Sequence, residues 1–150
     1  MGRRYAMTGT IAAVASSAKT MLDLVAATTT RARVYDFSVG TTGAPADNVM
    51  TYTAQRFTAS GTYTAGQMAA VDSADPAALL TSGTNNTAEP TYTASTILWN
   101  LGINQRASYR WVAAPLGELV VPATANNGVG WATLSPAYTG VAGTTAFEEE

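Results

Sequence analysis

The feature that most constrains the fold is an alternation of apolar and polar residues over short runs. In the run 31–39, Tyr35, Phe37 and Val39 share one parity. The alternation is clearest in 107–113, where Tyr109 and Trp111 fall on one side and Ser108 and Arg110 on the other. A period of two predicts half-buried strands in antiparallel sheets.

Residues that favour turns interrupt these runs at short intervals, including Asn127-Gly128, which suits a tight reversal between strands. Between the turns lie segments rich in Thr, Val, Ile and aromatic residues. About eight short strands in a chain of this length predict one all-β domain over residues 1–150, a sandwich or a barrel. The predicted strands are 18–26, 31–39, 48–59, 62–70, 97–103, 107–113, 118–122, 129–134 and 138–147.

One short helix is predicted near 76–81. Asp75 is a suitable N-cap, Pro76 is favoured at the first helical position, and Gly83 follows as a stop signal.

The residue types that are missing exclude several classes of chemistry. The chain has no cysteine and no histidine, so disulfides, thiolate nucleophiles and the usual zinc and haem ligands are absent. Only 12% of the residues are charged, and one lysine, Lys19, stands among eight basic residues. A surface poor in lysine loses little solvation when it is covered, which suits a protein held in an assembly. An extracellular monomer with a threonine-rich surface is the alternative.

The acidic residues outside the carboxyl end are expected to serve turns and caps, not catalysis. Arg56, Arg106 and Arg110 are either partners of these acids or contacts between copies. A carboxylate pair would suffice for a glycosidase, and Asp72 with Asp75 would suit calcium, but neither spacing is specific. We therefore expect no catalytic, cofactor or metal site. These acidic residues are Asp23, Asp36, Asp47, Asp72, Asp75, Glu89 and Glu118.

Charge and hydropathy also narrow the range of partners. A net charge of −2 and a pI near 5.0 give no basic surface for nucleic acid. No apolar run approaches a membrane span, and Thr8, Gly9 and Thr10 interrupt the stretch that would resemble an export signal. The sequence predicts neither a nucleic-acid nor a membrane partner.

The two ends of the sequence carry most of the clustered charge. Arg3, Arg4 and Tyr5 are candidate interface residues on an extended amino-terminal arm, residues 1–15, that would lie along a neighbouring subunit. The alternative is a frayed end. Residues 148–150, all glutamate, are expected to form a flexible acidic tail, or to pair with these arginines across a subunit boundary.

The aromatic rows are expected in the core. They include Tyr35 with Phe37, Trp99, and Tyr109 with Trp111. A platform that stacks on sugars or bases is the alternative reading.

Three stretches resemble the head decoration (cement) proteins of tailed bacteriophages that have a jelly-roll fold. They are residues 104–122, residues 127–130 and the opening residues 2–10. The resemblance implies a single jelly roll that forms homotrimers on the outside of an icosahedral head, assembled in the host cytoplasm. It further implies the major capsid protein as partner, no enzymatic activity and no cofactor.

Three alternatives remain open at this stage. The chain would also suit a tail or fibre module, or a carbohydrate-binding module with Trp131, Tyr138 or Trp99 exposed. A small hydrolase with a carboxylate pair is the third.

Overall fold

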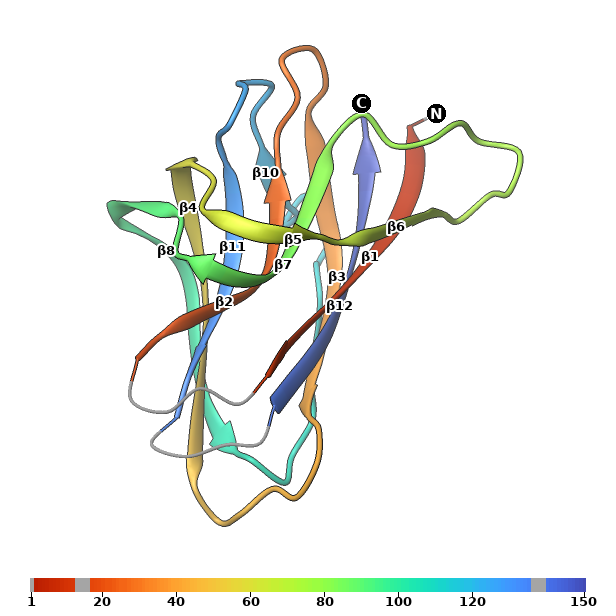
Figure 1. Cartoon of the computed structure of the whole chain (residues 1–150). Coiled ribbons are helices and arrows are strands. Elements are labelled where there is room, and N and C mark those ends of the chain that lie inside the picture. Colours follow the sequence, from red (N-terminus) through yellow and green to blue (C-terminus); the bar gives the residue numbers. More distant parts are fainter. Residues whose placement is uncertain (1, 13–16, 136–139) are drawn as a thin grey trace.

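A computed structural model describes residues 2–12, 17–135 and 140–150 of the chain. Two antiparallel sheets of six strands each pack face to face (Figure 1). The predicted all-β class is confirmed, as is a two-sheet arrangement compatible with a sandwich. The prediction of about eight strands was too low, because the described residues form twelve.

In the first sheet the strands follow the order β10-β3-β12-β1-β6, and β9 pairs with β3 beside β10. The order in the second sheet is β5-β7-β2-β11-β4-β8. The bounds of the first sheet are β1 Arg3–Ala12, β3 Ala32–Thr41, β6 Gln67–Ala70, β9 Tyr109–Val112, β10 Leu119–Val121 and β12 Gly140–Glu149. Those of the second are β2 Lys19–Val25, β4 Val49–Ala59, β5 Thr62–Ala65, β7 Thr81–Ala88, β8 Thr91–Asn104 and β11 Gly128–Leu134.

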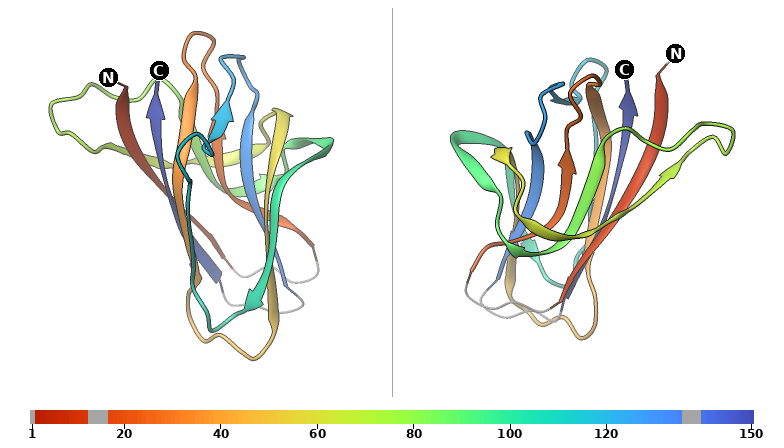
Figure 2. Two further views of the ribbon diagram at one scale, coloured as in Figure 1. Left: turned by 180° about the vertical axis from the view of Figure 1, so that it is seen from behind. Right: turned by 45° about the horizontal axis from the view of Figure 1, so that its top comes forward.

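The chain passes repeatedly from one sheet to the other. It crosses between β1 and β2, β2 and β3, and β3 and β4, and again on the way to β9, β11 and β12. The segment from β5 to β7 lies on one side of the sandwich (Figures 1 and 2). There β6 pairs with β1 of the first sheet, while β7 pairs with β2 of the second.

Strands β1 and β7 were not predicted, and the predicted strand 62–70 is divided into β5 and β6. The run 81–88 is rich in Ser, Gly, Asn and Thr, which predicted a turn, yet it pairs on both sides as β7. The predicted strand 62–70 divides at Gly66, whose N–H donates to the Ser82 carbonyl at 2.8 Å. Pairing with neighbouring strands outweighed local propensity in both segments.

The predicted helix at 76–81 is wrong, since the described residues contain no helix and Thr81 begins β7. A helix would join the Leu80 N–H to the Pro76 carbonyl. Instead that N–H donates to Glu149 Oε1 at 2.9 Å, and the Pro76 carbonyl accepts the Tyr5 hydroxyl at 3.0 Å. Two tertiary hydrogen bonds therefore replace the helical one.

The core lies between the sheets and is centred on aromatic rings. Trp131 is 1% exposed and stacks on Phe37 with ring centroids 5.5 Å apart. Trp99 packs against the same Phe37 ring at 5.4 Å and against Tyr109 at 6.2 Å. The aromatic rows thus supply the core, as predicted. Tyr35 is the exception: the pairing of β3 with β12 shifts there, and Tyr35 is not among the half-buried aromatic residues that pack against the core.

Candidate interaction surfaces and a buried polar network

Arg3, Arg4 and Tyr5 do not belong to a separate arm. They open β1, which pairs with β12 on one side and with β6 on the other, so residues 3–12 are neither a free arm nor a frayed end. Tyr5 is 1% exposed and stacks on Phe147 at 5.6 Å, which corrects its assignment as an interface residue. Arg3 and Arg4 are exposed and remain available for contacts. Residues 1 and 13–15 of the expected arm lie outside the described residues.

The carboxyl end is not a free tail either. Glu148 and Glu149 belong to β12, opposite Arg4 and Arg3. Glu149 is buried, and its Oε1 accepts the N–H groups of residues 79 and 80 at 2.9 Å each. Glu150 is exposed, forms an ion pair with Arg33 at 2.7 Å and exchanges backbone hydrogen bonds with Arg31. The glutamates therefore hold the loop 71–80 and strand β3 within the same chain.

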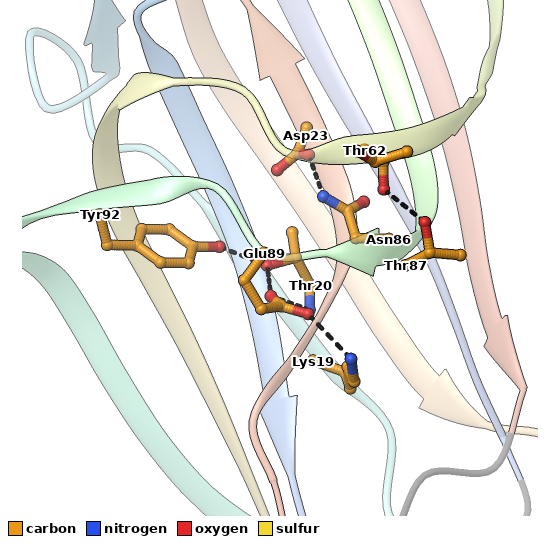
Figure 3. A network of polar contacts seen from close by, with 8 residues as sticks. All are labelled: Lys19, Thr20, Asp23, Thr62, Asn86, Thr87, Glu89 and Tyr92. Atoms are coloured by element: carbon orange, nitrogen blue, oxygen red, sulfur yellow. Dashed lines mark hydrogen bonds and ion pairs between the residues drawn. The ribbon is translucent and has the colours of Figure 1, made fainter.

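A polar network lies on the outward face of the second sheet (Figure 3). Glu89 Oε2 accepts the Thr20 backbone N–H at 2.9 Å and the Thr20 hydroxyl at 2.5 Å. The Thr20 hydroxyl also lies 2.6 Å from the Tyr92 hydroxyl, and Lys19 Nζ lies 3.6 Å from Glu89 Oε1. These contacts tie the connection between β7 and β8 to β2.

Asp23 is the most deeply buried charged group of this network. It is 0% exposed, and its Oδ2 accepts a hydrogen bond from Asn86 Nδ2 at 2.6 Å. Its Oδ1 has no hydrogen-bond partner in the described part of the chain. Burial raises the pKa of Asp23 to about 7, against a lowering by the Asn86 hydrogen bond, and the Glu89 charge raises it further.

A glycine in β11 makes room for this packing. A Cβ at Gly130 would lie 2.4 Å from the Tyr92 hydroxyl and 2.8 Å from Asp23 Oδ1. Tyr92 can therefore lie close to the sheet, where its ring meets Phe57 edge-on at 6.4 Å. Thr20, Asp23 and Asn86 are thus buried on this face, where the network's bonds join β2 to β7 and β8.

Other acidic side chains form turns, as expected, or ion pairs with arginines, which the sequence left open. Asp36 pairs with Arg110 at 2.5 Å, and Asp47 with Arg106 at 3.3 Å. Asp72 Oδ1 accepts the N–H of residue 74 at 2.9 Å. Within residues 2–12, 17–135 and 140–150, no three side chains of the metal-ligating types group closely enough to hold a metal ion.

The outward face of the first sheet has a different character. Small, neutral side chains from β1, β3 and β12 line a shallow hollow in it. Thr8, Thr10 and Thr144 are exposed there, and Arg110 is the charged residue among those that line it. The lining includes Thr8, Thr10, Ser38, Gly40, Ala142 and Thr144, which we call the threonine face.

Of the aromatic residues that would stack on a sugar, the two tryptophans are not exposed as a platform. Trp131 and Trp99 lie against Phe37 between the sheets. Tyr138 lies outside the described residues.

Sequence reasoning missed the special position of Asp23. Asp23 stands between Leu22 and Leu24 inside the predicted strand 18–26, and this alternation predicts an exposed acid, so the local pattern pointed away from burial. The role of Gly130 depends on Tyr92, which is distant in sequence, so the sequence offered no signal for it.

Comparison of the chain with models of known families, with curated proteins and with solved structures finds no match. Among the described residues, no helix has the length and apolar character needed to cross a membrane.

Proposed function

We propose that the protein is a virion structural protein: a decoration (cement) protein that binds the assembled head of a tailed bacteriophage as a homotrimer. In this proposal it contacts the major capsid protein on the outer capsid surface, catalyses no reaction and uses no cofactor. The fold we propose is a jelly roll, which consists of eight strands in two Greek keys.

The strand order supports the proposed jelly roll. Without β5, β6 and β7, one sheet reads β1-β12-β3 followed by β9 and β10, and the other reads β2-β11-β4-β8. The first and last strands are then neighbours, as are the second and the second-to-last. This nested order is that of a chain folded back on itself as one long hairpin and rolled up, with β9 and β10 together in the place of one strand.

The observation that carries the functional proposal is the threonine face. It offers a broad surface whose neutral, short side chains lose little solvation and little conformational entropy when a neighbouring molecule covers them. Such a surface suits contact between identical copies. Each bound trimer would then stabilise the shell by mass action, because it binds the assembled lattice and not the dissociated subunits.

A tail or fibre module has the same composition and is the alternative within this class. A carbohydrate-binding module has less support, because Trp131 and Trp99 are used in the core.

Two measurements test the proposal. Sedimentation equilibrium should give a mass of three chains, and the protein should cosediment with empty heads of its source virus but not with isolated tails. Cosedimentation with tails alone would favour the alternative. Absence of binding to any particle of that virus would refute the proposal.

A matched pair of variants tests the exposed arginines as head contacts. The double change Arg3→Ala and Arg4→Ala should weaken cosedimentation, whereas Arg31→Ala, at another exposed arginine, should not. Equal binding by both variants would remove Arg3 and Arg4 from the contact.

A further inference from the structure

The connection between β9 and β10 presents a leucine to solvent in an unfavourable backbone conformation. Leu116 is 92% exposed and has a φ of +65°. The Gly117 N–H donates to the Ala114 carbonyl at 2.8 Å, so residues 114–117 form a β-turn with Pro115 second and Leu116 third. Proline followed by positive φ is typical of a type II turn, in which the third position is usually glycine or asparagine.

Leucine at this position is doubly disfavoured in the isolated chain. A side chain other than glycine or asparagine is strained at positive φ, and a fully exposed leucine gains nothing from burial. No residue that the structure describes requires the leucine, because the Leu116 side chain barely contacts them. Backbone strain of this kind clusters at sites that contact other molecules, so the strained turn points to a contact for Leu116 outside its own chain.

The same chain carries a surface that suits this side chain. The hollow in the threonine face is lined mainly by apolar surface. Its charged neighbour is Arg110, whose side chain is 65% exposed. Asp36 of the same chain accepts hydrogen bonds from Arg110 Nε and Nη2, which leaves the Nη1 N–H groups as donors for a second acid. The leucine turn is followed by Glu118, a half-buried acid that lies 3.9 Å from Arg33. An apolar knob followed by an acid thus matches an apolar hollow beside a base.

We propose that Leu116 of one copy inserts into the threonine-face hollow of a second copy of this chain, with Glu118 directed toward Arg110 of that copy. The contact joins two different surfaces, so each copy offers one knob and one hollow. Contacts of this type close into a ring when the rotation between copies allows it. This inference rests on the proposed homotrimer and names the residues that hold it together.

The test changes each half of the contact separately. Leu116→Asn removes the knob and places a residue that tolerates positive φ. Thr144→Lys introduces a long charged side chain across the hollow at an exposed position. Each change should raise the dissociation constant for self-association at least about tenfold, as measured by sedimentation equilibrium.

Two controls match these changes in chemistry but lie elsewhere. Val49→Asn removes an apolar side chain that is 57% exposed on β4, and Thr64→Lys adds a lysine at an exposed threonine on β5. Both should leave self-association unchanged.

A stability measurement separates an interface role from a structural one. At a concentration low enough to dissociate the copies, Leu116→Asn should unfold at the same urea concentration as the wild type or at a higher one, because the turn is relieved of strain. A structural role predicts a lower midpoint together with any loss of association, and that result would overturn the inference.

The remaining outcomes separate this inference from the proposed function. A trimeric wild type whose mass is unchanged by Leu116→Asn refutes the knob and leaves the decoration function standing. If self-association depends on Leu116 but the protein binds no phage head, the Leu116 contact is supported and the decoration function is refuted. A monomeric wild type that requires Leu116 for head binding would place the hollow on the capsid and refute the contact between copies.

Discussion

Asp23→Asn should stabilise the protein, and the gain should grow as the pH rises. Burial raises the pKa of Asp23 from 3.8 to about 7. The folded state therefore binds a proton that the unfolded state releases near pH 4. Ionisation of Asp23 lowers the free energy of unfolding. This loss is absent below pH 4, grows with each pH unit up to about pH 7, and stays constant above that pH. Asparagine carries no charge and keeps an oxygen that can accept from Asn86.

The magnitude follows from the size of the pKa shift. One pKa unit corresponds to about 1.4 kcal/mol, so a shift from 3.8 to about 7 gives an upper limit of roughly 4 kcal/mol above pH 7. Glu89, Lys19 and Tyr92 are the other titratable groups of the network. Both proteins keep all three groups, so the difference between variant and wild type reports the change at position 23.

Urea unfolding of both proteins from pH 4 to pH 9 measures this difference directly. The advantage of Asp23→Asn should rise by about 1.4 kcal/mol per pH unit between pH 4 and pH 7 and then level off. Asp47→Asn, at an exposed ion pair with Arg106, is the control and should show no comparable slope. A constant difference across the range would refute the raised pKa.

Three further changes test the packing. Glu149→Ala should lower the free energy of unfolding in urea by about 2–3 kcal/mol, because the backbone N–H groups of residues 79 and 80 lose a charged acceptor. Hydrogen exchange at these two N–H groups should accelerate, and unchanged exchange would contradict this. Gly130→Ala should destabilise by about 1–3 kcal/mol, because its Cβ would overlap the Tyr92 hydroxyl, and a neutral effect would show that the site is loose. Deletion of residues 3–8 should unfold the chain by circular dichroism, because β1 pairs on both sides; a folded product would restore the arm interpretation.

The sequence predicted the parts of the fold that depend on local pattern. The alternation in 31–39 and 107–113 placed Phe37 and Trp111 toward the core. A turn before β11 was also predicted, but at Asn127-Gly128. The structure places it at residues 124–127, where Asn126 has the positive φ and the Asn127 N–H donates to the Thr124 carbonyl. These features follow from periodicity and turn chemistry, which a single segment carries within itself.

Features that depend on distant partners were not predictable in this way. The segment before β7 has a helical start signal, but Glu149 and Tyr5 take the groups that a helix would use. The opening run 3–12 looked like a free arm, because its place between β12 and β6 is set by strand order and not by its own residues.

Some candidate contact residues could be recognised from the sequence, and one could be recognised only in the folded chain. Arg3 and Arg4 could be named from the sequence, because clustered arginines are recognisable there. Leu116 could be recognised only as part of a turn, since its positive φ and its exposure are properties of the folded chain.

The central claim, that the protein stabilises an assembled phage head, is tested most directly by heating. Purified heads of the source virus should be titrated with the protein, and the temperature at which they release DNA or come apart should be recorded. The account predicts that this temperature rises with added protein and reaches a plateau when the sites are filled. Heads that come apart at the same temperature at every concentration of the protein would contradict it.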